Sequence, residues 1–382
     1  MKTSIRLRGA LVLAAAALAV ALWSPEPVCQ ERAGAQRTGA ALYQAACAAC
    51  HGMRGTGVEQ SRLGFDIPMP DFTDCSFATR EPNADWLAVA HDGGPARAFS
   101  RLMPAFGEAL NEAELERVLD HMRGFCPDKA WPRGELNLPR PLVTEKAYPE
   151  DEAVITTAIA TEDPSSISNK LVYEKRFGAR NQVELIVPFG WKRRESVPQG
   201  DDSGNWAGGM GDIAVGAKRA LVHSLRHGSI FSVAGELVLP TGDRAKDLGK
   251  GTTVFEPFAA FGQVLPSDFF LHAQAGAEFP FDTDRAKREA FWRAALGRTF
   301  ESERFGRAWS PMVELLGARE LDTREKVQWD LVPQMQVTLS KRQHIMFAIG
   351  TRIPLTDSGP RRTELAFYLL WDWFDGGLFD GW

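Results

Sequence analysis

Two cysteines and a histidine form the part of the sequence with the clearest chemical meaning. Cys47 and Cys50 are separated by two residues, and His51 follows at once. A c-type haem is attached at this spacing, because both thiols reach the porphyrin vinyl groups while the next imidazole comes under the iron. A redox dithiol or half a zinc site would also contain the two cysteines, but no second C-x-x-C completes a zinc cluster. The motif predicts one covalently attached haem c, with thioethers to Cys47 and Cys50 and His51 as the proximal ligand.

The N-terminal residues have the pattern of an export signal. Basic side chains come first, those of Lys2, Arg6 and Arg8. The apolar stretch that follows, residues 10–23, is too short to span a bilayer comfortably. We expect an export signal over residues 1–22, with cleavage after Ala21 or after Ala35. The formal net charge of the 382 residues is −5, so no basic domain is available for nucleic acid.

The remaining cysteines point to a disulfide, because an exported chain meets an oxidising compartment. Outside the haem motif they are Cys29, Cys75 and Cys126. If Cys29 is removed or idle, Cys75 and Cys126 can form a structural disulfide that ties a loop to a helix. The alternatives are two buried free thiols and, for Cys29, a lipid anchor, for which the preceding residues are a poor context.

Short helices must hold the haem motif. Residues 38–49 have a helical pattern that places Gly39 and Tyr43 on one face. Residues 85–91 have a second helical pattern, which is shorter. Residues 52–73 carry glycines and prolines and are expected to be loop.

A further helix is expected after Asn111, because Asn111 and Glu114 have the spacing of a capping box. Apolar side chains then recur at intervals of three and four residues: Leu115, Val118, Leu119, Met122 and Phe125. We expect this face to pack on the first helix.

Residues 37–128 resemble a small class I monohaem cytochrome c. The resemblance is carried by Gly39 and Tyr43, by the haem motif with Gly52, Gly55 and Gly57 behind it, and by Met103-Pro104-Ala105-Phe106. In that family the methionine of the M-P-x-F segment is the distal iron ligand, so the resemblance implies this role for Met103, and a thioether ligand raises the reduction potential. Met69, His91, His121 and an open iron position are the alternatives.

A six-coordinate iron leaves no position for a substrate, so we expect this domain to transfer single electrons and not to catalyse. The sequence contains no catalytic constellation. An enzyme with a five-coordinate iron, acting on peroxide or another small substrate, is the least favoured hypothesis.

Residues 129–151 form the expected boundary between two domains. Prolines occur here and just before, at positions 127, 132, 139, 141 and 149. This density favours an extended, semi-rigid linker. An irregular arm that lies along one of the domains is the alternative.

In residues 152–382 apolar and polar residues alternate with a period of two, which predicts strands. About twelve alternating runs are centred near Ile155, Tyr173, Leu185, Val215, Val233, Phe258, Ala273, Ala295, Val313, Val332, Phe347 and Phe367. Most are long enough to cross a bilayer, for which a tilted strand needs about nine to eleven residues. The predicted fold is therefore two-domain: a small all-α cytochrome c domain, then an all-β antiparallel transmembrane barrel of about twelve strands, with lipid outside and a polar lumen.

Two short motifs add a second resemblance. The segment Gly209-Met210-Gly211-Asp212 and the segment Pro240-Thr241-Gly242-Asp243 resemble the strand start and turn of a loosely characterised group of outer-membrane barrels. That group is associated with transport and aromatic-compound pathways. Acidic residues such as Glu314 and Asp330, with Lys218 and His272, fall mostly on polar faces, where they either select solutes by charge or pair with one another.

The leading hypothesis is a c-type cytochrome electron carrier tethered to an outer-membrane barrel, with the haem domain in the periplasm. Its expected partners are periplasmic redox proteins and outer-membrane lipid, with a small solute in the lumen as a further candidate. The alternative is an outer-membrane transport channel whose haem domain gates, senses or docks a redox partner.

Overall fold

The computed structural model describes residues 37–64, 67–162, 165–193, 206–322, 325–356 and 361–372. The expected export signal with its cleavage sites, and Cys29, lie outside these ranges. In the described ranges no helix is both long and apolar enough to span a membrane. Contacts group the chain from Gly39 onward as one compact unit.

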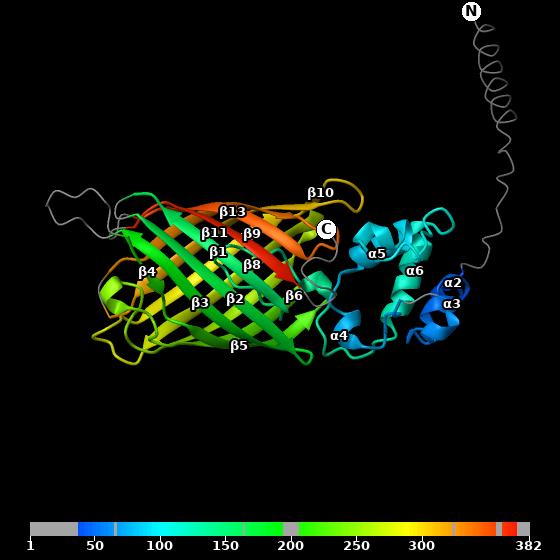
Figure 1. Cartoon of the computed structure of the whole chain (residues 1–382), viewed down its shortest axis with the longest axis horizontal. Helices are drawn as coiled ribbons and strands as arrows, with labels where there is room; N and C mark the ends of the chain where they lie inside the picture. Colours follow the sequence, from blue (N-terminus) through cyan, green and yellow to red (C-terminus); the bar gives the residue numbers. More distant parts are fainter. Residues whose placement is uncertain are drawn as a thin grey trace, which may run out of the picture. The chain divides into compact units, whose positions relative to one another are not determined.

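The N-terminal part consists of short helices and loops (Figure 1). Its described α-helices are α2 (Gly39–Ala46), α3 (Ala48–His51), α4 (Cys75–Ala78), α5 (Asn83–Asp92) and α6 (Glu112–Arg123). Short 3-10 helices lie between or after them: η1 (Gln60–Arg62), η2 (Gly94–Arg97) and η3 (Gly134–Leu136). In the described part of the stretch expected to be loop, residues 52–73, the one helical element is the single turn η1, in agreement with the glycines and prolines there.

The predicted capping box is confirmed at the start of α6. The Asn111 side chain accepts from the Glu114 amide at 3.0 Å, and the Glu114 carboxylate accepts from the Asn111 amide at 3.2 Å. These bonds satisfy two backbone donors that the first turn of a helix leaves without partners. The helix therefore begins where the sequence predicts.

Helix α6 packs closely on α2, as expected from its apolar face. The side chains of Leu42 and Tyr43 from α2 are buried in one cluster with Leu115, Val118, Leu119 and Met122 from α6. A Cβ on Gly39 would lie only 2.0 Å from the carbonyl oxygen of Arg117. The two backbones thus approach to a distance that only glycine permits.

Strands within residues 152–372 form a single antiparallel sheet that closes on itself, because β1 pairs with β14 (Figure 1). In the described residues the sheet has fourteen strands, of which β4 (Trp206–Met210) and β10 (Phe300–Glu301) are short additions. The other twelve are β1 (Glu152–Ala160), β2 (Ser166–Phe177), β3 (Asn181–Arg193), β5 (Ala214–Ser224), β6 (Ser229–Val238), β7 (Val254–Val264), β8 (Phe269–Pro280), β9 (Glu289–Arg298), β11 (Ala308–Glu320), β12 (Gln328–Thr338), β13 (Ile345–Pro354) and β14 (Glu364–Asp372). The predicted barrel of about twelve strands is confirmed, and each predicted centre lies in one of these strands.

The barrel wall has an apolar outer face and a polar inner face. Exposed apolar side chains alternate along the strands and include Leu171, Tyr173, Leu185, Val215, Val233, Phe255, Leu315 and Leu369. Buried polar side chains alternate with them and include Glu174, Gln182, Ser232, Gln274, Glu314 and Gln334. Apolar side chains outside and polar ones inside are the arrangement of barrels that span lipid.

The two ends of the described barrel lie at the same rim. Turns at that rim are mostly short and occupy residues 178–180, 225–228, 265–268 (with η5, Pro266–Asp268) and 339–344, whereas the connection 299–307, which contains β10, is longer. The opposite rim carries longer connections such as 239–253 (with η4, Arg244–Lys246). Strand β1 begins and β14 ends at the short-turn rim, since Glu152 pairs with Asp372.

Candidate functional site

The haem motif lies at the junction of α2 and α3. Cys47 caps the N-terminus of α3, and Cys50 and His51 are the last two residues of that helix. The single helical turn brings the two cysteines and the histidine together, as the spacing predicts. The hydroxyl of Tyr43 on α2 donates to the carbonyl oxygen of Gly52 at 2.8 Å and so fixes the end of the motif.

The loop after the motif folds back on it. The Gly57 amide donates to the His51 carbonyl at 2.8 Å, and the Val58 amide donates to the Cys50 carbonyl at 3.1 Å. Gly52 has a φ of 73°, and a Cβ there would lie 2.8 Å from the carbonyl oxygen of Gly57. The glycines of this loop therefore serve the tight return of the chain.

The side chains of the motif fit a covalently attached haem. Cys47 and Cys50 are free thiols, whereas the other cysteines in the described residues are joined to each other. Buried Nδ1 of His51 has no hydrogen-bond partner among the described residues, an arrangement that is costly unless a further group is bound. The residues that would hold the haem are thus Cys47 and Cys50 by thioether bonds and His51 by its imidazole, and the bound iron would supply one-electron redox chemistry.

Burial determines the charge of these groups. Desolvation by burial, together with a smaller electrostatic repulsion from Cys50, raises the pKa of Cys47 to about 11. The thiol of Cys47 is therefore neutral. Burial also lowers the pKa of His51, which favours the neutral imidazole that can ligate a metal. Burial is the main reason why the pKa of Tyr43 is raised to about 12, and electrostatic repulsion from Cys47 adds to it. The hydroxyl of Tyr43 therefore remains protonated and can donate to Gly52.

Met103 and Met69 lie on different segments. A Cβ on Gly57 would lie 2.7 Å from the Cβ of Met69, so Met69 packs on the loop that carries His51. The Met103 carbonyl accepts from the Gly94 amide at 3.0 Å, which holds the M-P-x-F segment against the end of α5. The two methionines whose thioethers could hold a haem iron therefore lie in different surroundings, Met69 against the loop after His51 and Met103 beside the end of α5.

The rival histidines have other partners. The ring of His121 lies 5.3 Å from that of Tyr43 and 5.0 Å from that of Phe125, so it belongs to the packing between α2 and α6. Nδ1 of His91 pairs with the carboxylate of Asp92.

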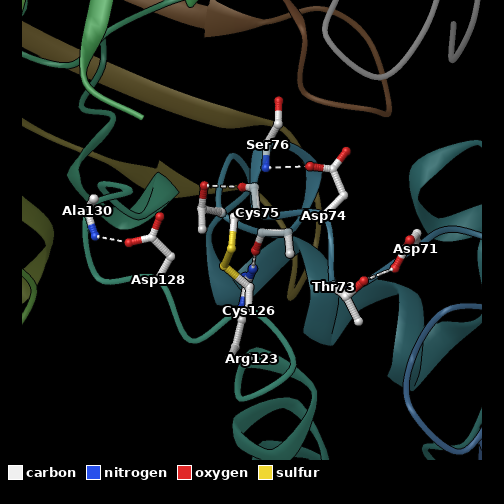
Figure 2. Close-up of a disulfide and its surroundings, with 11 residues drawn as sticks. Asp71, Thr73, Asp74, Cys75, Ser76, Arg123, Cys126, Asp128 and Ala130 are labelled. Atoms are coloured by element: carbon white, nitrogen blue, oxygen red, sulfur yellow. Dashed lines mark hydrogen bonds between the residues drawn. A yellow bond between two sulfur atoms is a disulfide. The ribbon is translucent and has the colours of Figure 1, made fainter. Parts of the chain in front are cut away.

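The expected disulfide between Cys75 and Cys126 is present, with 5.3 Å between the Cα atoms (Figure 2). Cys75 begins α4, where the Asp74 carboxylate accepts from the Ser76 amide at 2.9 Å, and Cys126 follows α6. Arg123 lies beside the bridge in Figure 2 and donates to the carbonyl oxygens of Ala78 and Glu81. The bridge therefore ties the loop before α5 to the end of α6, as the cysteine count predicts.

Residues 134–151 lie inside the barrel, and we refer to them as the lumen segment. Thirteen of its residues are buried: Gly134, Leu136, Leu138, Arg140, Pro141, Leu142, Thr144, Lys146, Ala147, Tyr148, Pro149, Glu150 and Asp151. Leu136 packs with Ala220, Ile230 and Ala260, and Leu138 packs with Phe270 and Met312. This proline-rich stretch is thus an arm packed within the barrel, and not a spacer exposed to solvent.

Polar side chains of the wall bind the backbone of the lumen segment. Glu314 accepts from the amides of Val143 and Thr144 at 3.1 and 2.7 Å, and from the Thr144 hydroxyl at 2.6 Å. Further contacts come from strands all round the barrel: Gln334 to Leu142, Gln274 to Glu145, Gln182 to Glu150, Lys218 to Lys146, Ser232 to Ala147, His272 to Pro139 and Tyr368 to Arg140. These bonds give the backbone of an irregular segment the partners it needs away from water.

Arg140 is the centre of an ion-pair cluster in the lumen. Its guanidinium contacts Glu174 at 2.9 Å and Glu145 at 3.2 Å, and also Glu152. Lys146 adds a second cation beside Glu150 and Glu152. Because these carboxylates are buried, removal of the arginine would leave them without sufficient compensation.

Asp330, one of the lumen charges singled out in the sequence, pairs with Arg352 and Arg361, but three others have a partner that the sequence did not suggest. Glu314, Lys218 and His272 bind the lumen segment instead of pairing with one another. Residues 136–151 contain a mixture of leucines and charges that a solvated spacer does not need, and this mixture could have indicated that the segment is buried. The prediction of a linker relied on the proline content alone.

The G-x-G-D and P-T-G-D motifs meet at the long-loop rim. The Asp212 carboxylate accepts from the Gly242 amide at 2.8 Å and from the Lys250 amide at 2.6 Å. A Cβ on Gly242 would lie 2.4 Å from the carbonyl oxygen of Leu248. These motifs thus shape the loop at residues 239–253.

Two family models match the chain in the parts that the fold separates. Residues 34–122 match the model described as "Cytochrome C oxidase, cbb3-type, subunit III". Residues 161–370 match the model described as "Putative MetA-pathway of phenol degradation". The chain is a cytochrome c-type domain followed by an outer-membrane barrel. By the second match, which spans more than half of the sequence, it belongs to the family of that description.

Solved structures similar to the chain are outer-membrane barrels. The COG4313 outer membrane channel from Pseudomonas putida F1 is 15% identical, with 62% of this chain and all of that chain covered and a TM-score of 0.44. The KdgM porin in complex with oligogalacturonate is 8% identical, with 58% and 99% covered and a TM-score of 0.38. The NanC porin is 8% identical, with 58% and 98% covered and a TM-score of 0.39. No curated protein is significantly similar to the chain.

Proposed function

We propose that the protein is a one-electron carrier whose haem domain is held at the periplasmic face of the outer membrane by its barrel. The observation that carries this proposal is the pair of free thiols at Cys47 and Cys50 beside His51, whose buried Nδ1 has no hydrogen-bond partner among the described residues. One haem c per chain would be attached there, with Met103 as the second axial ligand. Two protein ligands leave no position for a substrate, which favours electron transfer over catalysis.

The rims of the barrel support this placement of the haem domain. Outer-membrane barrels have short turns on the periplasmic side and long loops outside. Strand β1 begins at the short-turn rim, and the helical residues precede it in the chain. This favours a haem domain in the periplasm, where soluble redox proteins are its partners.

The test is to replace His51 by alanine and Cys47 and Cys50 by serine in separate variants of the full chain. We expect both to be recovered in the outer-membrane fraction as folded barrels, and both to lose the covalent haem stain or the normal reduced spectrum. A colourless wild-type chain, or one that stays in the aqueous phase without detergent, would contradict the proposal.

A second candidate function is an outer-membrane channel whose haem domain gates it or docks a redox partner. The specific observation in its favour is the polar wall around the lumen segment, which an inert membrane anchor does not need. Liposome swelling with small sugars and amino acids separates the two candidates, because a channel admits solutes whether or not haem is bound.

A further inference from the structure

The inner wall of the barrel carries a line of carboxylates just inside the long-loop rim. Glu236 pairs directly with Glu256 across β6 and β7, and Glu278 pairs directly with Glu289 across β8 and β9. Each of the four lies at most two residues from the end of its strand at that rim. Exposed apolar neighbours such as Phe255 point to the other side of the wall, so the four carboxylates face the lumen.

Glu184 on β3 extends this line toward β2. Glu184 pairs with Gly216 on β5, and Gly216 pairs in turn with Glu236. A Cβ on Gly216 would lie 2.3 Å from Oε1 of Glu184, so the carboxylate occupies the place that a side chain of β5 would fill. This oxygen is therefore directed along the wall toward Glu236. We refer to the five residues as the carboxylate row: Glu184, Glu236, Glu256, Glu278 and Glu289.

Four of the five carboxylates have no cation beside them. Lys250 pairs with Glu278, but in the described ranges no ion pair or hydrogen bond reaches the side chains of the other four. Of the cations that face this part of the lumen, Arg293 and Lys218 are bonded to other groups, and Lys170 pairs with none of the described carboxylates. Like charges directly opposite one another destabilise a sheet, so the row favours the binding of a cation from solution.

Glu184 gives independent evidence of a missing partner. It is 9% exposed, and its buried Oε1 has no hydrogen-bond partner among the described residues. Gln182, two residues earlier on the same face of β3, accepts from the Glu150 amide at 2.7 Å. A buried acceptor that stays unpaired beside such a satisfied neighbour is expected where a further group binds.

The row is accessible from the long-loop rim. Its members on β6 to β9 are only partly buried, and none of them is bonded to the described lumen segment. The wall residues of β6 and β8 that do bind that segment are Ser232 and Gln274, each four residues farther from the rim than Glu236 and Glu278. Long loops of outer-membrane barrels lie outside the cell, so a ligand of the row would come from the exterior.

The shape of the row indicates the kind of cation. Neighbouring strands are about 4.8 Å apart, so the carboxylates on β6 to β9 lie in a line, one on each strand. In the described part of the chain, no three carboxylate, histidine or cysteine side chains converge so as to hold a metal ion. Metal ions such as Ca²⁺ need several oxygens around one point. An alkylamine with several ammonium groups instead presents its charges along a chain, with N–H donors for charge-assisted bonds to carboxylates.

From these observations we propose that the carboxylate row is a binding site for a linear oligoamine that enters the lumen at the long-loop rim. Its ammonium groups donate to Glu184, Glu236 and Glu256, and its methylene chain lies along the wall between them. The site requires neither electron transfer nor an open channel, so it goes beyond both functions proposed above.

The experiment measures the binding of putrescine, spermidine and magnesium to the full chain in detergent, by titration calorimetry at neutral pH and low ionic strength. We expect spermidine to bind at least about tenfold more tightly than putrescine, because its third ammonium reaches a further carboxylate. Magnesium has the same charge as putrescine. It should bind at least about tenfold more weakly than putrescine, because the carboxylates do not converge on one ion.

The test variant is Glu236→Gln with Glu256→Gln, which removes two adjacent charges and keeps the shape of both side chains. Its affinity for spermidine should fall at least about tenfold. The matched control is Glu162→Gln with Asp284→Asn, which removes two charges from exposed connections at the same rim. The control should bind spermidine like the wild type.

Thermal unfolding of the barrel, followed by its heat-modifiable migration on gels, keeps a misfolded variant from being mistaken for a lost site. Without amine, the double-glutamine variant should be at least as stable as the wild type, because it relieves the repulsion between opposed carboxylates. Spermidine should raise the midpoint of the wild type but not that of the double-glutamine variant, since a ligand stabilises only the folded state that binds it.

Three results would contradict these expectations. A double-glutamine variant that binds spermidine as tightly as the wild type would overturn the site. A wild type that binds no amine at neutral pH would also overturn it, and would mean that protons supply the missing charge. Magnesium that binds as tightly as putrescine would overturn the choice of an oligoamine. None of these measurements depends on the haem spectrum or on solute passage, which test the proposed functions.

Discussion

Gly39→Ala tests the close approach of α2 and α6, on which the haem motif depends. The new Cβ would lie 2.0 Å from the Arg117 carbonyl oxygen and 2.8 Å from its carbonyl carbon. Ordinary contacts of this kind are longer by more than about 1 Å, and the obstacle is backbone, which cannot rotate away. The helices must separate, and the cluster that contains Leu42, Tyr43, Leu115 and Met122 must repack.

Two effects of opposite sign decide the magnitude. Alanine is favoured over glycine within a helix by about 1 kcal/mol. Overpacking of a core costs about 1–3 kcal/mol, and an obstacle formed by backbone places this case at about 3 kcal/mol. We therefore expect the free energy of unfolding of the helical part to fall by about 2 kcal/mol. For a unit of this size, that corresponds to a midpoint lower by about 8–16 °C.

The assay is thermal unfolding of the full chain in detergent, followed by the haem absorbance, which reports the helical part and not the barrel. Ala40→Gly, on the exposed side of the same helix, is the control and should lose only about 1 kcal/mol from helix propensity. A Gly39→Ala protein that melts at or above the wild-type temperature would show that α2 and α6 do not meet as described.

Three further changes test other parts of the molecule. Met103→Ala should give a reduced haem that binds carbon monoxide, whereas Met69→Ala should keep the wild-type spectrum; the reverse result would assign the ligand to Met69. Asp212→Asn should weaken the bonds to the Gly242 and Lys250 amides, so that limited proteolysis of intact cells cuts within residues 239–253 faster than in wild type, and equal rates would argue against this role. Cys75→Ser together with Cys126→Ser should lower the stability of the helical part by about 4 kcal/mol, given the 51-residue separation of the bridge, and unchanged haem-detected melting would refute the estimate.

Local patterns determined what could be predicted from the sequence. Asn111 and Glu114 satisfy each other's backbone within three residues, and the alternation around Leu185 or Val332 needs only neighbours along one strand. The haem motif is equally local, since one helical turn holds Cys47, Cys50 and His51. Those features required no knowledge of distant contacts.

The position of the lumen segment could not be predicted in this way. Thr144 and Glu314 are 170 residues apart, and Leu142 and Gln334 are 192 apart. Prolines exclude helix and central strand but do not say whether the chain is covered by water or by protein. Charged residues of the lumen segment are buried here because they pair with one another, as Arg140 does with Glu145, and with side chains of the wall such as Glu174.

The four cysteines of the helical part impose an order on maturation. Four thiols permit three pairings, and oxidation of neighbours as the chain emerges would join Cys47 to Cys50 before Cys75 meets Cys126. A bridge within the haem motif would block both attachment points, so a thiol reductant must reopen it while sparing the bridge between α4 and α6. Without that reductant, we expect a colourless chain with no free thiol in this region, countable by alkylation and mass measurement. The proposed electron carrier would thus begin its activity with a reduction performed in an oxidising compartment.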